Sequence, residues 1–89
     1  MDRDILERQL IKSEEQVVIA AQNVARQREL VAQLERDGHD ASQAQKMLEQ
    51  FLKQQALHIG ERDRLIKELS ELPPSLGSDA LRSGRDENP

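Results

Sequence analysis

The chain has 89 residues, a formal net charge of −4, one aromatic residue (Phe51) and no cysteine. This length allows one small domain, and the lack of cysteine excludes disulfides, thiol catalysis and cysteine-ligated metal or iron–sulfur sites. Charged residues make up 34% of the chain, and the apolar residues are mainly aliphatic. Such a composition is typical of long helices and coiled coils.

The first predicted element is a helix over about residues 3–36, a stretch without Gly or Pro. Asp4, followed by Glu7 three residues later, has the pattern of a capping box, in which two side chains satisfy free backbone amides. Asp2 is an alternative cap.

A tight turn is predicted at residues 37–40, where the sequence reads Asp37, Gly38, His39, Asp40. Gly38 favours the left-handed conformation that closes helices. Asp40 is the predicted cap of the next helix, with Gln43 as its capping-box partner. A short connection of this kind makes consecutive helices antiparallel neighbours.

The second predicted helix covers about residues 41–72 and ends before Pro73 and Pro74, because proline cannot continue a helix. Gly60 is a weak point inside it, where a kink is an open alternative. Residues 73–89 are rich in Pro, Gly, Ser and charge, which predicts a disordered tail. The domain organisation is therefore a helical hairpin over residues 1–72 followed by this tail.

Each helix carries a row of residues at alternating spacings of three and four, which is the coiled-coil pattern. We call these rows the seams. The first seam is Leu6, Leu10, Ser13, Val17, Ala20, Val24, Gln27, Val31 and Leu34, and the second is Ala44, Leu48, Phe51, Gln55, His58, Arg62, Leu65, Leu69 and Leu72. The two rows match in length, as an antiparallel hairpin requires.

A second set of apolar residues lies one position beyond the seams, which is a rotation of about 100° around each helix. It consists of Ile11, Val18, Ala25, Leu52, Ile59 and Ile66. The two helices run in opposite directions, so both rotations lead to the same side of the hairpin. We call this set the apolar face. It predicts pairing of two hairpins into a four-helix bundle, whereas a docking surface for a different protein, or exposed residues without a role, are the alternatives.

Five polar residues interrupt the seams: Ser13, Gln27, Gln55, His58 and Arg62. Polar seam residues commonly fix the register of a coiled coil or its oligomeric state. His58 is interpreted as an ordinary polar seam residue, with a pH switch as the alternative. Arg62 lies near the level of Glu14 and Glu15, so an ion pair across the helices is expected.

The sequence shows no nucleophile paired with a base and no glycine-rich phosphate loop, and its two histidines lie too far apart to share a metal. We therefore expect a non-enzymatic protein without cofactors, metal or a small-molecule substrate. Acidic and basic residues alternate along the chain, which disfavours nucleic-acid binding. No apolar run reaches the roughly 20 residues of a membrane span, the start lacks a secretory signal pattern, and a cytoplasmic location is the expectation.

The stretch from Gln27 to Asp40, with its Asp-Gly-His-Asp turn, and the later run His58, Arg62, Asp63, Arg64, Leu65 resemble a small family of uncharacterised α-helical proteins. That family is common in rhizobia and related proteobacteria. The resemblance covers about residues 24–69 and implies a bacterial source, without implying an activity or a ligand.

Together these patterns predict an all-α interaction module that acts through helix–helix contacts, as a scaffold or regulatory protein. The expected partner is a second copy of the chain or another helical protein. A small nucleic-acid-associated regulator, of antitoxin or nucleoid type, is the alternative, and a basic face on the folded protein would favour it.

Overall fold

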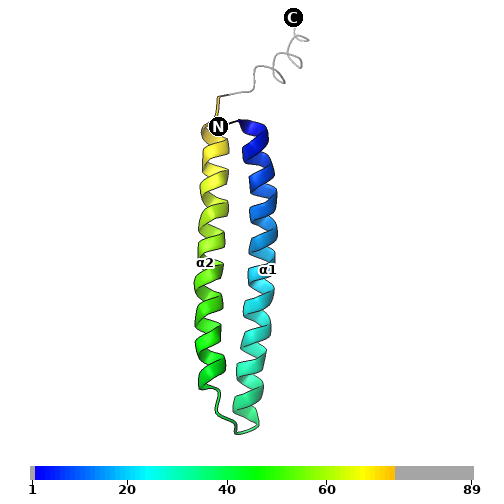
Figure 1. Ribbon diagram of the computed structural model, residues 1–89, viewed down its shortest axis with the longest axis vertical. Helices are drawn as coiled ribbons and strands as arrows, with labels where there is room; N and C mark the ends of the chain where they lie inside the picture. Colours follow the sequence, from blue (N-terminus) through cyan, green and yellow to red (C-terminus); the bar gives the residue numbers. More distant parts are fainter. Residues whose placement is uncertain (1, 74–89) are drawn as a thin grey trace, which may run out of the picture.

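The structure is a computed structural model that describes residues 2–73. Helix α1 spans Arg3–Arg36 and helix α2 spans Ser42–Glu71. They lie side by side and antiparallel along their whole length (Figure 1). The start of α1 and the end of α2 form what we call the open end, opposite the turn. The predicted hairpin is confirmed, and its pairing into a four-helix bundle stays a prediction. Apart from Pro73, the predicted tail lies outside the described residues.

Helix α1 is capped by Asp2, the alternative that the sequence offered. The Asp2 carboxylate accepts a hydrogen bond from the backbone amide of Asp4 at 3.4 Å, and its carbonyl accepts one from the amide of Leu6 at 3.1 Å. Asp4 lies inside the first turn, where it pairs with Arg8. The capping box predicted at Asp4 is therefore wrong, because the helix already begins at Arg3.

The turn has the predicted geometry. Gly38 adopts a φ of +75°, the left-handed region that favours glycine. The amide of His39 donates to the carbonyl of Leu34 at 2.8 Å, and the amide of Gly38 donates to that of Glu35 at 3.1 Å. These two bonds form a Schellman motif, which satisfies carbonyls that the end of α1 would otherwise leave free.

Helix α2 begins one residue later than predicted. Its N-cap position is Ala41, and the carboxylate of Asp40 reaches forward to accept hydrogen bonds from the backbone amide of Ser42 at 3.0 Å and from its hydroxyl at 2.8 Å. The capping box of Asp40 with Gln43 is therefore wrong. The physical reason is packing: Ala41 is buried against Val31 at the end of the hairpin, so this residue belongs to the core.

Helix α2 continues without interruption through Gly60 and ends at Glu71, two residues before Pro73. The helix is not broken at Gly60, because the roughly 1 kcal/mol that a mid-helix glycine costs is small beside the packing of a 30-residue helix.

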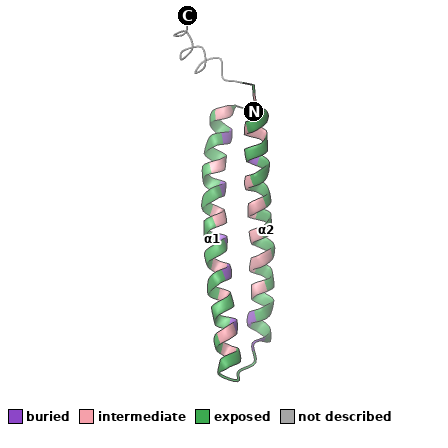
Figure 2. Cartoon of the chain, turned by 180° about the vertical axis from the view of Figure 1, so that it is seen from behind, coloured by how far each residue is buried: buried purple, intermediate pink, exposed green. Residues whose placement is uncertain are grey.

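The core is the narrow strip between the helices, and the outer faces are exposed (Figure 2). At the turn, Val31, Ala41 and Ala44 are buried together, with Leu34 and Leu48 packed against them. Towards the open end, Leu6 and Leu65 are each only 1% exposed. All of these except Ala41 are seam residues, so the predicted seams form the contact between the helices.

Candidate interaction surface

The apolar face is exposed mainly along α1. Ile11 is 59% exposed and Val18 is 55% exposed, and Ala25 is also exposed. On α2, Ile66 is 45% exposed, while Leu52 and Ile59 are half-buried beside the seam. A single hairpin thus leaves a row of aliphatic side chains in water.

The middle of this face is free of charge. Residues 16–25 of α1 and 54–60 of α2 contain no acidic or basic side chain. In the antiparallel pairing these two windows lie at about the same level, since Gln16 and Ala20 line a small hollow together with Gln54 and His58. The charged side chains of the described hairpin therefore flank an uncharged belt around its centre.

The five polar seam residues all lie between the helices. Ser13 is buried, and Gln27, Gln55, His58 and Arg62 are half-buried. Gln27 Nε2 donates to the backbone carbonyl of Ala44 at 2.9 Å. This bond joins α1 to the first turn of α2, so Gln27 ties the helices together near the turn.

Arg62 does not pair with Glu14 or Glu15 as predicted. Its Nε and Nη2 atoms donate to Asp63 Oδ1 at 3.1 and 3.0 Å. The side chain is about one-third exposed, and ion pairs near the surface contribute at most about 1 kcal/mol, so small differences decide which partner is used. The expected cross-helix pair is wrong for this reason.

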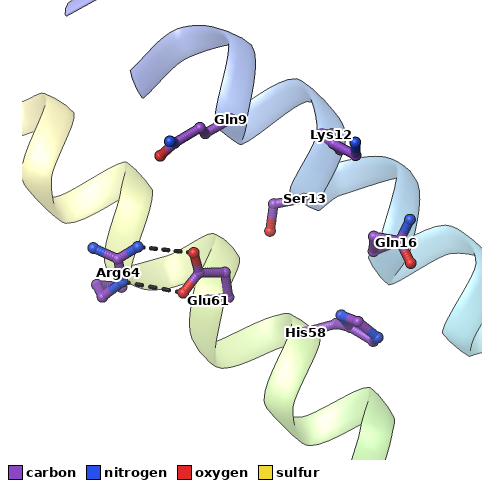
Figure 3. Close-up of a pocket in the computed structure, with 7 residues that line it drawn as sticks. All are labelled: Gln9, Lys12, Ser13, Gln16, His58, Glu61 and Arg64. Carbon is purple, nitrogen blue, oxygen red and sulfur yellow. Dashed lines mark hydrogen bonds and ion pairs between the residues drawn. The ribbon is translucent and has the colours of Figure 1, made fainter. Parts of the chain in front are cut away.

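A shallow groove of about 470 Å³ lies between the helices on the side opposite the apolar face (Figure 3). We call it the polar groove, and its lining residues are Gln9, Lys12, Ser13, Gln16, His58, Glu61 and Arg64. Sequence reasoning missed it, although Gln9 and Gln16, seven residues apart, mark a polar row on this side of α1.

Ser13 is the unusual member of the polar groove, because its Oγ is buried without a hydrogen-bond partner in the described structure. His58 lines the same groove but does not accept a hydrogen bond from this hydroxyl. A serine nucleophile needs a base within hydrogen-bond reach, so this pair lacks the arrangement of a hydrolase.

Two charged residues that line the polar groove, Glu61 and Arg64, pair with each other within α2. Arg64 donates to Glu61 at 2.8 and 3.1 Å, and it also pairs with Glu68. The hydrogen bond from Arg64 lowers the pKa of Glu61, and the same bond raises the pKa of Arg64.

Among residues 2–73, no three His, Asp or Glu side chains gather where they could hold a metal ion. Neither described helix is long and apolar enough to cross a membrane.

Comparison of the chain with protein-family models, with curated proteins and with solved structures finds no match in any of the three. The resemblance to rhizobial helical proteins therefore stays a prediction. The structure itself defines the class of fold, an antiparallel two-helix hairpin.

Proposed function

We propose that this protein is a non-enzymatic helical interaction module that self-associates through its apolar face and works as a scaffold or regulatory protein. The single observation that carries the proposal is the row of Ile11, Val18 and Ile66, each about half exposed along one side of a hairpin with a thin core. Contiguous apolar patches on monomers are rarely larger than a few hundred Å² and usually mark interaction sites.

The size of the face supports a stable contact. A helix of 34 residues is about 50 Å long, and two helices side by side are about 20 Å wide. Covering that side would bury roughly 1,000 Å² on each copy, more than the ~800 Å² per partner of a standard interface. Two hairpins packed face to face would form a four-helix bundle.

Sedimentation of the whole chain tests the proposal. We expect a dimer at micromolar concentration, and we expect Ile59→Glu to dissociate it, because the interface would have to bury an unpaired carboxylate. Leu57→Glu is the matched control: it adds the same charge two residues away in α2, at a position 73% exposed and outside the apolar face. A stably folded monomer at high concentration would contradict the proposal, as would equal dissociation by both variants.

The alternative of a nucleic-acid-associated regulator would be favoured by a basic face, whereas acidic and basic residues are interspersed along both helices and Arg3, Arg8 and Arg64 pair with acidic neighbours. A salt-dependent shift of DNA or RNA in a gel by the wild-type dimer would favour it. The proposal includes a cytoplasmic, bacterial setting, which is supported only by the sequence patterns.

A further inference from the structure

We propose that the second copy docks with its turn at the opposite end of the bundle, so that α1 lies on α1 of the partner copy and α2 on its α2. This inference rests on the proposed self-association and specifies its geometry. Two identical hairpins that meet through the same face are related by a two-fold axis in the plane of contact. An axis along the hairpin places both turns at one end, and an axis across the hairpin places them at opposite ends.

Side-chain size distinguishes these two arrangements. Along α1 the apolar face shrinks from Ile11 through Val18 to Ala25, from the open end towards the turn. With a two-fold axis across Val18, Ile11 of one copy meets Ala25 of the other, and Val18 meets Val18. Each layer then contains a similar volume, as close packing requires.

The same axis suits α2. Val18 and Ile59 lie equally far along the chain from the turn at Gly38 and His39. The axis therefore passes near the level of Ile59, and it pairs Ile66 of one copy with Leu52 of the other. In the other arrangement, with both turns at one end of the bundle, Ile11 and Ile66 of both copies would share a single layer. Ala25 of both copies would then lie in the layer nearest the turns. That layer would be underpacked, and cavities in a core cost stability.

Charge favours the same orientation. The half of the hairpin at the open end, residues 2–20 and 58–72, contains nine acidic and six basic residues, which gives a net charge of −3. The half at the turn, residues 21–57, contains five of each and is neutral. If both turns lay at one end, the open-end halves of the two copies, each with a net charge of −3, would face each other. If the turns lie at opposite ends, each acidic half faces a neutral half, which avoids this repulsion.

One charged pair follows from this geometry. Glu7 and Arg28 each follow a seam residue on α1, so both border the apolar face. They lie 11 and 10 residues from Val18 in opposite directions, which places Glu7 within about 1.5 Å, along the helix axis, of the level of Arg28 of the partner copy. Within its own chain Arg28 forms no ion pair among the described residues, whereas Glu7 lies 3.9 Å from Arg3.

Distances between spin labels test the orientation directly. The natural chain has no cysteine, so His39→Cys places a single label on the exposed turn of each copy. Turns at opposite ends predict a label-to-label distance of about 60 Å, and turns at one end predict less than about 30 Å, from the rise of 1.5 Å per residue. Sedimentation of the same labelled protein measures whether it is a dimer or a monomer.

The outcomes separate the two proposals. A dimer with the long distance supports the orientation. A dimer with the short distance overturns the orientation and leaves self-association intact. A folded monomer without a dipolar signal overturns both.

A charge exchange provides a second, independent measurement. Glu7→Arg and Arg28→Glu should each weaken dimerisation about two- to fivefold, the range of exposed ion pairs, and the double variant should recover the parental affinity. With turns at one end, Glu7 would instead face the acidic end of α2 of the partner, so Glu7→Arg would relieve repulsion and strengthen dimerisation. Absence of recovery in a folded dimer would contradict the orientation.

Discussion

The ends of the hairpin and its middle use the same seam positions for different side chains. At the turn, Val31 packs with Ala44 and Leu48, and towards the open end Leu6 and Leu65 are almost fully buried. In the middle, the seam of α2 reads Gln55, His58 and Arg62, all of them half-buried and polar. The aliphatic residues of this middle part of α2, Leu52, Leu57 and Ile59, lie outside its seam.

This difference separates two roles within one short chain. The apolar ends hold the helices together and fix which residues face each other. In the middle, the polar seam residues of α2 lie opposite an α1 seam that still buries Ala20 and Val24. Under the proposed self-association, a second hairpin would cover the aliphatic side chains that this part leaves exposed. An amphipathic helix with apolar residues on two sides needs two neighbours.

The sharpest test of the apolar ends is Leu65→Ala. Leu65 is 1% exposed, and truncation of a fully buried leucine costs about 2–5 kcal/mol, because apolar contacts are lost and a cavity remains. Leu57→Ala in the same helix removes a side chain that is 73% exposed and should change stability by less than about 0.5 kcal/mol. Urea unfolding followed by circular dichroism measures both. Similar losses for the two variants would show that the seam is not the core.

Glycine substitutions should have opposite signs at the turn and in the middle. Gly38 has a φ of +75°, where an L side chain costs about 1–2 kcal/mol, so Gly38→Ala should destabilise the hairpin by that amount. Gly60 lies inside α2 with a helical backbone, and no atom of α1 lies within 4 Å of an added Cβ. Gly60→Ala should therefore stabilise the protein by about 1 kcal/mol.

Thermal unfolding of the two glycine variants beside the parent provides the measurement. Loss of stability at Gly60 would mean that this glycine is needed for a contact that the isolated hairpin does not contain.

Ser13 lies on the border between the open end and the middle, and its buried hydroxyl has no hydrogen-bond partner. An unsatisfied buried polar group is costly, and alanine is the better helix former, so Ser13→Ala should stabilise the hairpin by about 1 kcal/mol. Ser70→Ala is the matched control, because Ser70 is exposed and donates to the carbonyl of Lys67 at 2.7 Å. Destabilisation by Ser13→Ala would reveal a partner for this hydroxyl, such as an ordered water molecule in the polar groove.

The features predicted correctly from the sequence are those with short-range causes. Gly38 closes α1 through hydrogen bonds to residues within five positions, and the leucine spacing sets the seams without knowledge of the partner helix. The start of α2 was misplaced by one residue because Ala41 is held by contact with Val31, ten residues away in sequence.

The errors at Arg62 and in the polar groove have a different cause. The choice of Asp63 over Glu14 as the partner of Arg62 depends on small differences between exposed ion pairs, each of which contributes at most about 1 kcal/mol. The groove depends on the side-chain conformations of Gln9, Gln16 and Glu61 across two helices. A periodic pattern indicates which side of a helix is polar, but it does not indicate whether that side is hollow.

The smallest expected effect is at the turn and depends on pH. The hydrogen bonds from the amide and hydroxyl of Ser42 lower the pKa of Asp40 in the folded protein below its usual value. The unfolded chain therefore binds this proton more readily than the folded one, and stability rises with pH through this range. The contribution of Asp40 is complete above the ordinary carboxyl pKa of about 4 and is lost as the pH falls through the lower pKa of the folded state.

Asp40→Ala should therefore lower the melting temperature at neutral pH, and the difference in melting temperature from the parent should disappear in acid. Glu29→Ala is the control, because Glu29 is exposed and accepts no side-chain hydrogen bond in the described structure. Its difference in melting temperature from the parent should not disappear in acid. If the gap for Asp40→Ala kept its size in acid, its origin would be the shape of the turn rather than the charge of the carboxylate.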